Sequence, residues 1–317
     1  DVDKGHVDTY AGTSQRYSQR ITCSEAVLRQ WDMCTTDISK AFLQGVTYEE
    51  LAAQTGDAVR EVNFYLPAYN VPQLQQVEGF EGFDPTTEVI HCDKPGTGSV
   101  DAPRCFSIKL SKVTEKAGLI ASNVDAELCY CHQIRNGKLT LVAIMTKHVD
   151  DLKAAGEKAV LLQIMRVIEE VFGEMKITWH TFTNCGVRHI QDKLTKEITL
   201  DQSEYVAQLK LIANEESRGS NSTTLCGPVL HQQYQSLLGA VAYTSLTRVD
   251  VLVFIVALQR YSHAPQIIHV KRLNALVKWM QANPRKLAYR KFPDDGSRAD
   301  NQHIKIIADS SFKKEEE

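Results

Sequence analysis

The sequence lacks any long hydrophobic segment. Although 43% of its 317 residues are hydrophobic, the longest apolar run extends only from Val251 to Leu258, whereas a membrane-spanning helix needs roughly 18 apolar residues. We therefore predict no membrane span and no membrane partner. No basic segment followed by an apolar one stands near the first residue, Asp1, so we expect an intracellular protein that is not secreted. Because Asp1 is not a methionine, we also expect the chain to be part of a longer protein.

The sequence also lacks an excess of positive charge. Lys and Arg total 36 and Asp and Glu total 39, which leaves a net charge of −3 and no global basic signature for nucleic acid. The eight cysteines are spread along the chain without a dense framework, so we expect reduced thiols. With only 17 Gly and 9 Pro, the composition excludes collagen-like and wholly disordered classes. The length suggests about two domains.

The clearest local pattern is a β-hairpin. Asn136-Gly137 separates the apolar run 127–134 from the apolar run 138–146, and Asn-Gly in this context strongly favours a two-residue hairpin turn. The second strand leads directly into Asp150 and Asp151. Near the beginning of the chain, helical spacing over residues 14–31 predicts an amphipathic helix that runs into a strand ending near Ile38.

Further elements follow from periodicity and from residues typical of helix ends. Long elements are not expected in residues 46–126, where prolines and glycines are frequent. After residue 225 the pattern is mainly helical, with breaks at 247–250 and 263–265. The other expected elements are a helix over 160–171, strands at 177–182 and 187–190, a capping box at 201–204 opening a helix to Ile212, and a linker at 215–224.

Three aspartates are predicted at strand ends. Asp37 ends the first strand, and Asp150 and Asp151 end the second strand of the hairpin. Hard divalent cations such as Mg²⁺ prefer oxygen ligands, and a pair of ions can clamp the attacking and leaving oxygens of a phosphoryl transfer. Adjacent aspartates also occur in ordinary turns, as predicted for Asp294-Asp295-Gly296, so the context alone leaves both interpretations open.

Several motifs in sequence order resemble those of copia-type retrotransposon reverse transcriptases. The segment from Thr36 to Gly45 resembles their first catalytic motif, which reads Asp, three variable residues and then Ala-Phe-Leu-x-Gly. His148-Val149-Asp150-Asp151 resembles the second, Tyr-Val-Asp-Asp, with His in place of Tyr. Weaker matches are Ala102-Pro103-Arg104, Leu200 to Tyr205, Leu237-Leu238-Gly239, Tyr243, Thr247 to Asp250, His269 and Asp309.

This resemblance implies an α+β fold with a reverse-transcriptase palm built on an antiparallel sheet. The implied segments are partial fingers and palm over 1–192, a small thumb and linker over 193–225, a helical connection over 226–295, and the truncated start of ribonuclease H over 296–317. The implied activity is RNA-directed DNA polymerisation, with an RNA template, a DNA primer and deoxynucleoside triphosphates as partners. The implied location is a cytoplasmic particle or the nucleus.

The resemblance also implies roles for individual residues. Asp37, Asp150 and Asp151 would be the catalytic residues that ligate two Mg²⁺ ions, with Mn²⁺ as a possible substitute. Phe42 would be the steric gate against a ribose 2′-hydroxyl, although its spacing equally suits a core phenylalanine. Substrate-binding positions would include Arg104 and also Asp101, which stands where the family has a neutral glutamine.

Residues 251–292 contain no Asp or Glu and are locally basic. Lysines and arginines with interleaved Tyr261, Trp279 and Tyr289 are suited to contacting phosphates and stacking on bases, but a solvated helix face is an equal alternative. The nucleic-acid-binding residues predicted here are Arg260, Lys271, Arg272 and Lys278.

Two smaller patterns favour structural roles. Cys129-x-Cys131 places two thiols on one face of a strand, and without a second pair at zinc spacing core cysteines are favoured. His263 and His269 are predicted to be capping or solvated residues. The resemblance thus supports a reverse-transcriptase fragment, which we expect to have reduced or no activity alone, with a decayed or co-opted, non-catalytic nucleic-acid-binding fragment as the alternative.

Overall fold

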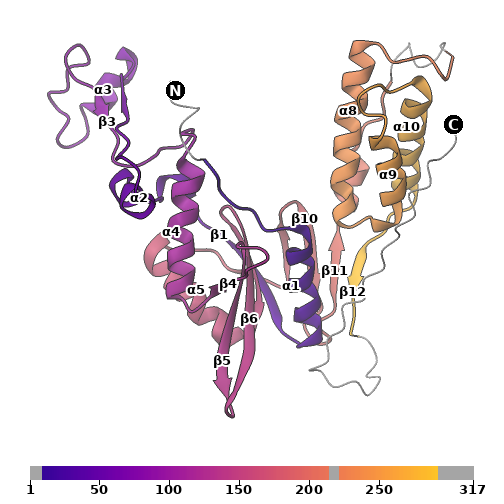
Figure 1. The fold of residues 1–317 in the computed structure, drawn as a ribbon, viewed down its shortest axis with the longest axis horizontal. Coiled ribbons are helices and arrows are strands. Elements are labelled where there is room, and N and C mark those ends of the chain that lie inside the picture. The colour runs from indigo at the N-terminus through magenta and orange to yellow at the C-terminus, as the bar shows by residue number, and fades with distance from the viewer. Residues whose placement is uncertain (1–8, 214–220, 292–317) are drawn as a thin grey trace.

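The computed structural model describes residues 9–213 and 221–291. Two arms rise from a base that consists of a β-sheet with helices packed against it (Figure 1). One arm carries α2 (Tyr48–Thr55), α3 (Val71–Leu74) and the short pair β2 (Asn63–Phe64) and β3 (Ile90–His91). The other arm is helical and contains α8 (Pro228–Tyr243). The architecture is mixed, with antiparallel sheets, and is compatible with the predicted α+β class.

The base is a six-stranded antiparallel sheet in the order β4-β5-β6-β7-β1-β8. Asn136 and Gly137 both have positive φ at the turn between β5 and β6, so the predicted hairpin is confirmed. The strands of this sheet are β4 (Ile120–Ala121), β5 (Leu128–Arg135), β6 (Lys138–His148), β7 (Asp151–Gly156), β1 (Asp32–Asp37) and β8 (Thr178–Trp179).

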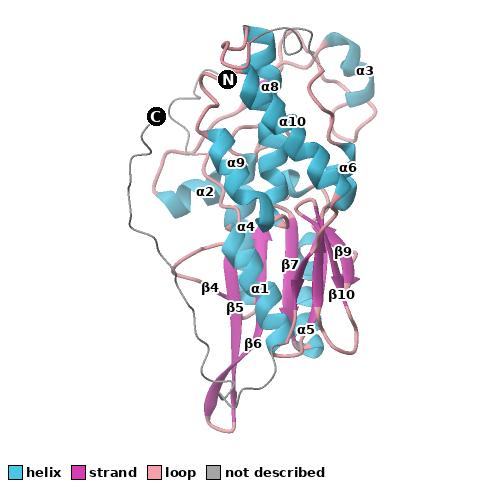
Figure 2. Cartoon of the chain, turned by 90° about the vertical axis from the view of Figure 1, so that its right-hand side faces the viewer, coloured by secondary structure: helices cyan, strands magenta, loops and turns pink. Residues whose placement is uncertain are grey.

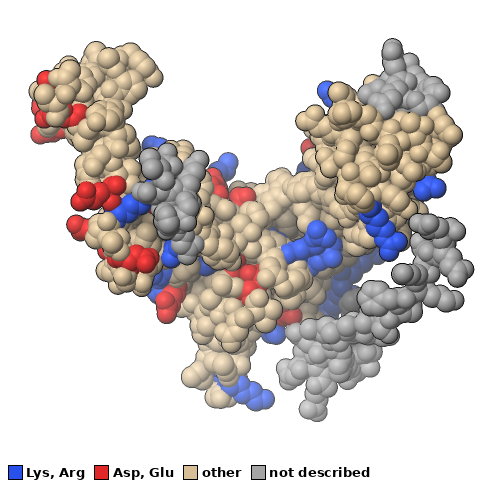
Figure 3. Space-filling model, turned by 45° about the horizontal axis from the view of Figure 1, so that its top comes forward, with Lys and Arg blue, Asp and Glu red and all other residues tan. Residues whose placement is uncertain are grey.

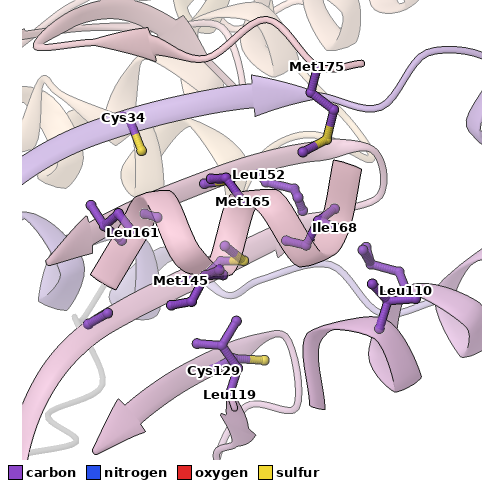
Figure 4. Packing of buried hydrophobic residues seen from close by; sticks show 14 of the residues in the cluster. Cys34, Leu110, Leu119, Cys129, Met145, Leu152, Leu161, Met165, Ile168 and Met175 are labelled. Carbon is purple, nitrogen blue, oxygen red and sulfur yellow. The ribbon is translucent and has the colours of Figure 1, made fainter. Parts of the chain in front are cut away.

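Two long helices, α4 (Ala102–Lys116) and α5 (Lys158–Phe172), cover one face of this sheet. Leu110 of α4, Ile168 of α5 and Met145 of β6 belong to the same buried cluster (Figure 4). The expectation of no long element in 46–126 is therefore wrong. Pro103 stands in the first turn of α4, where its missing N–H costs no helical hydrogen bond, and the helix continues beyond it.

Helix α1 (Arg16–Leu28) and a second antiparallel sheet pack against the other face, as Figure 2 shows from the side. The predicted strand 177–182 is interrupted at His180, whose φ of 64° turns the chain from the first sheet into the second. The strands of the second sheet, in spatial order, are β12 (Leu287–Tyr289), β11 (Ile198–Asp201), β10 (Val187–Gln191) and β9 (Thr181–Asn184).

The helical arm contains α6 (Ser203–Gln208), α8, α9 (Leu252–Gln259) and α10 (Ile267–Ala282) around their own buried cluster. Two short 3₁₀ helices, η3 (Thr244–Leu246) and η4 (Val249–Val251), join α8 to α9 at the predicted break. The predicted capping box at 201–204 is absent among these described residues, because Asp201 belongs to β11 and its carboxylate accepts from the N–H of Ser203. The helix there ends at Gln208 instead of continuing to Ile212.

The predicted thumb segment 193–225 is divided between the base and the helical arm. Strand β11 pairs with β10 in the second sheet, whereas Val206 of α6 packs into the cluster of α8 and α10. The end of the helical segment returns to the base, since β12 pairs with β11. The predicted ribonuclease H segment 296–317, including Asp309, and the predicted turn at Asp294 lie outside the described residues, as does much of the linker.

Two further predictions, one about the cysteines and one about membrane spans, can be compared with the described residues. All eight cysteines are free thiols, and Cys129 and Cys131 are buried in the core as expected. Within 9–213 and 221–291, no helix is both long and apolar enough to cross a membrane.

Candidate functional site

The three aspartates predicted as metal ligands lie at one end of the central sheet. Asp37 is the last residue of β1, and Asp151 is its partner on the neighbouring strand β7. Asp151 begins β7 instead of ending β6 as predicted, because residues 149–150 form a tight turn that reverses the chain. Asp150 lies in this turn, and its carbonyl oxygen accepts a hydrogen bond from the N–H of Ile38 at 3.4 Å. Antiparallel pairing therefore brings together residues that are more than a hundred positions apart.

The turn between β6 and β7 has an unusual backbone. Val149 has a φ of 59°, a conformation that is costly for a β-branched residue because its Cβ crowds the following carbonyl. Such strain persists only where the surrounding structure holds it, and it occurs often at functional sites. Here pairing of His148 with Asp151 on one side and of Asp37 with Asp151 on the other fixes the turn.

The electrostatics of these carboxylates favour a cation. Partial burial, and then the charge of Asp150, raise the pKa of Asp37 above its usual value. Burial also raises the pKa of Asp151, followed by the charges of Asp150 and Asp37, while a hydrogen bond from the backbone N–H of Cys185 acts in the opposite direction. Because like charges oppose one another's ionisation, a bound cation would stabilise all three ionised groups.

The donor set suits a hard divalent cation, since it offers carboxylate oxygens only. Among the residues that the structure describes, however, no three His, Cys, Asp or Glu side chains converge closely enough to form a ready-made metal site. The fit to Mg²⁺ therefore rests on the oxygen chemistry of Asp37, Asp150 and Asp151 and on their mutual repulsion.

The site faces the hollow between the two arms. In Figure 1 the tip of the β5–β6 hairpin points away from the arms, so the opposite end of β6, with residues 149–150, lies toward them. Figure 3 shows the molecule hollowed between the arms, with acidic side chains on the floor and basic side chains toward the helical arm.

Phe42 and Arg104 lie on neighbouring elements beside this site. Phe42 belongs to the 3₁₀ helix η1 (Ala41–Leu43), which follows Asp37 and packs against α4. A Cβ on Gly45 would stand 2.9 Å from the Cβ of Cys105, so this glycine allows η1 to approach α4 closely. Phe42 is partly buried against the core and keeps part of its ring exposed. Both interpretations of Phe42 therefore remain compatible with its position.

Asp101 is not available to a substrate, which corrects its assignment as a binding residue. Its side chain is fully buried, and its Oδ2 pairs with the Nη1 of Arg60 at 2.5 Å. The guanidinium of Arg60 also lies over the ring of Tyr48. The negative charge at position 101 thus faces a cation within the chain, and Arg104 remains the candidate for substrate contact on α4.

The predicted nucleic-acid-binding residues lie on the helical arm. Arg260 directly follows α9, and Lys271, Arg272 and Lys278 lie on α10, all with exposed side chains. The interleaved aromatic residues are partly committed to internal contacts. The ring of Tyr261 stacks on the ring of His269, with 3.9 Å between the ring centroids. The guanidinium groups of Arg248 and Arg285 lie over the ring of Trp279.

The two histidines of this region differ. The Nδ1 of His269 accepts from the N–H of Gln266 in a capping box, so the capping interpretation is confirmed for this buried residue. His263 is exposed, as the alternative of a solvated residue requires.

Sequence reasoning missed a buried basic pair behind the carboxylates. The Nζ of Lys153 lies 3.4 Å from the Nε2 of His189, and burial lowers the pKa of both groups. They line a cavity of about 370 Å³ that also contacts His148, Cys185 and Tyr243. The sequence gives no sign that Lys153 is buried. Side chains alternate between the two faces of a strand, so the residue after Leu152 could equally lie on an exposed face.

The chain matches no family model. It is 21% identical over 290 residues to the retrovirus-related Pol polyprotein from transposon RE2 of Arabidopsis thaliana, and 20% identical over 290 residues to that from transposon RE1. Each alignment covers 88% of this chain. The chain spans 18% of the length of these curated relatives. The similarity relates the chain to retrotransposon Pol polyproteins.

Proposed function

We propose that this chain is the polymerase portion of a retrotransposon reverse transcriptase and that it extends a DNA primer on an RNA template. The observation that carries the proposal is the pairing of β1 with β7, which places Asp37 beside Asp151 and next to the strained turn that contains Asp150. The similarity to Pol polyproteins supports it independently.

In this proposal the carboxylates hold two magnesium ions, for which manganese can substitute. When bound, the ions would stabilise the attacking oxygen and the leaving pyrophosphate of the nucleotidyl transfer. The chain's own residues fix the geometry: pairing of Asp37 with Asp151 sets the spacing of two carboxylates, and the turn presents Asp150. Arg104 contributes positive charge toward the triphosphate, and the exposed part of Phe42 limits space at the sugar.

The test is primer extension with an RNA template, a DNA primer, deoxynucleoside triphosphates and Mg²⁺. We expect extension that depends on the template and stops when the divalent ion is chelated. Specific binding of the template–primer without any extension, in either Mg²⁺ or Mn²⁺, would favour the alternative of a co-opted nucleic-acid-binding fragment. A chain that neither binds the template–primer nor extends it would contradict both functions.

The exposed basic residues of α10 support a second part of the proposal, namely contact with the phosphates of the template–primer. Replacing Arg272 and Lys278 with glutamine should weaken binding and make the plot of log affinity against log salt less steep by roughly 2, since each phosphate contact contributes about 0.9 to the slope. Binding measured by fluorescence anisotropy over a salt series checks this expectation.

A matched control removes the same charge elsewhere. Arg135 and Lys138 flank the hairpin tip that points away from the hollow. Their double replacement with glutamine should leave the salt dependence unchanged. If the α10 double variant keeps the original slope, its basic residues form only a solvated helix face.

A further inference from the structure

The cavity of about 370 Å³ beside the central sheet is bounded by both the base and the helical arm. Gln19 of α1, Lys153 of β7 and His189 of β10 line it from the base. Tyr243 of α8 and Leu246 of η3 line it from the helical arm. Its volume lies at the small end of the roughly 300–1,000 Å³ that is typical of sites for small molecules. The cavity is therefore large enough to hold a small ligand.

The charged side chains of this cavity are basic. Lys153, which is only 1% exposed, lines it together with the exposed Arg16. Neither Asp nor Glu is among the described residues that line it. Because a buried cation without a counter-ion is costly, the cavity favours a ligand with negative charge.

The hydrogen-bond partners of the Lys153 amine are neutral in the part of the chain that the structure describes. Its Nζ donates to the carbonyl oxygen of Gln19 at 3.2 Å and to the Nε2 of His189 at 3.4 Å. The Nδ1 of His189 donates to the carbonyl oxygen of Val187 at 2.9 Å, which leaves Nε2 as the accepting nitrogen. Since an ammonium group has three N–H bonds, one of them remains for a ligand.

The thiols that interact with this amine do not supply a negative charge. Burial raises the pKa of the Cys23 thiol and raises that of Cys185 to about 11, so both thiols are neutral near pH 7. The hydroxyl of Tyr243 is engaged elsewhere, because it donates to the carbonyl oxygen of Cys185 at 2.6 Å. A counter-charge for Lys153 therefore has to come from outside the described residues.

A second polar group of the cavity also lacks a partner. The side chain of Asn184 is 2% exposed and donates from Nδ2 to the hydroxyl of Thr35 at 3.4 Å, but its Oδ1 accepts no hydrogen bond from the described residues. A buried amide oxygen without a donor is unfavourable, so an N–H or O–H group on a ligand would stabilise it. Val187, Leu200 and Leu246 add apolar surface to the same cavity.

We propose that this cavity binds a small aromatic or aliphatic molecule that carries one anionic group, such as a carboxylate, and one N–H or O–H donor. The anionic group pairs with the Nζ of Lys153, and the donor bonds to the Oδ1 of Asn184. The apolar part contacts Val187, Leu200 and Leu246. Because both the base and the helical arm line the cavity, the bound molecule contacts both. This inference is independent of the proposed function, since it requires neither nucleic acid nor a metal ion.

The test compares two fluorescent probes, anilinonaphthalene sulfonate and its uncharged parent, phenylnaphthylamine. The probes share their rings and their N–H group, and only the first carries an anionic group. Each is titrated into the whole chain without nucleic acid, and its emission increases on transfer from water to apolar surroundings. The unaltered chain should bind the sulfonate at a single site. Absence of such binding would overturn the proposal.

Lys153→Met removes the amine and keeps an unbranched side chain. It should weaken binding of the sulfonate by about tenfold or more, because a charge-assisted contact is lost, and change the affinity for the uncharged parent by less than about twofold. Lys112→Met is the matched control, since Lys112 is exposed on α4, which covers the opposite face of the sheet. Both affinities should be unchanged in this control. Equal sulfonate affinity in Lys153→Met and in the unaltered chain would contradict the proposed ligand class.

Leu246→Phe locates the bound probes without altering a charge. The larger ring narrows the cavity from the side of the helical arm, so both probes should bind more weakly. Thermal melting of each variant reports any general loss of folding. Unchanged binding of both probes in Leu246→Phe would place their site elsewhere and overturn the proposal, even if Lys153→Met does not fold. An equal loss of both probes in a folded Lys153→Met would overturn the selection for an anion.

Discussion

Asp150→Asn is expected to reduce nucleotide incorporation to background, a loss on the order of a thousandfold or more, because it removes a charged oxygen ligand from a site that works by charge stabilisation. The measurement is single-nucleotide primer extension at saturating template–primer. Glu170→Gln, a change of equal charge at an exposed position of α5, is the control and should keep full activity. Incorporation by Asp150→Asn at the rate of the unaltered chain would contradict the assignment of the site.

The same substitution should not destabilise the fold. The pKa values of Asp37 and Asp151 are raised, first by burial and then by the charge of Asp150. A carboxyl whose pKa is higher in the folded state contributes stability that is fully present below its unfolded pKa and is lost as the pH rises through the folded pKa. Removing the charge of Asp150 reduces this loss near neutral pH. The melting temperature of Asp150→Asn, measured without divalent ions, should equal or exceed that of the unaltered chain.

The sequence predicts those parts of the fold that depend on local chemistry. Asn136-Gly137 determines the hairpin because its two residues can adopt positive φ, and the apolar spacing of α5 is that of a helix with one buried face. The sequence does not predict helix α4, because prolines and glycines are frequent over 46–126, although a proline in the first turn of a helix, such as Pro103, is tolerated. Strand β7 was missed because Asp151 was placed at the end of the preceding strand.

The candidate site was predicted only in part, because its geometry depends on contacts between distant residues. The three aspartates could be named from motifs, and the position of Asp37 beside Asp151 follows from antiparallel pairing of β1 with β7. Asp101 was misplaced for a similar reason: its partner Arg60 lies in a loop whose path the sequence does not reveal.

Loss of the Arg60–Asp101 ion pair is expected to destabilise the fold much more than loss of an exposed arginine–carboxylate pair. Arg60→Met should lower the free energy of unfolding by about 3 kcal/mol, because it leaves a buried carboxylate without its cation. The side chain of Asp101 is fully buried, whereas that of Arg60 is 21% exposed, and the second oxygen of Asp101, Oδ1, already has no hydrogen-bond partner. Urea unfolding monitored by circular dichroism measures the change.

Arg135→Met provides the contrast, since Arg135 pairs with Glu157 at the same distance of 2.5 Å but both side chains are substantially exposed. An ion pair in water contributes little to stability, because solvent screens it, so this variant should be nearly as stable as the unaltered chain. Adding Asp101→Asn to Arg60→Met should recover at least half of the loss, because the neutral amide is less costly to bury than an unpaired carboxylate. Equal, small effects of Arg60→Met and Arg135→Met would mean that burial of Asp101 does not depend on Arg60.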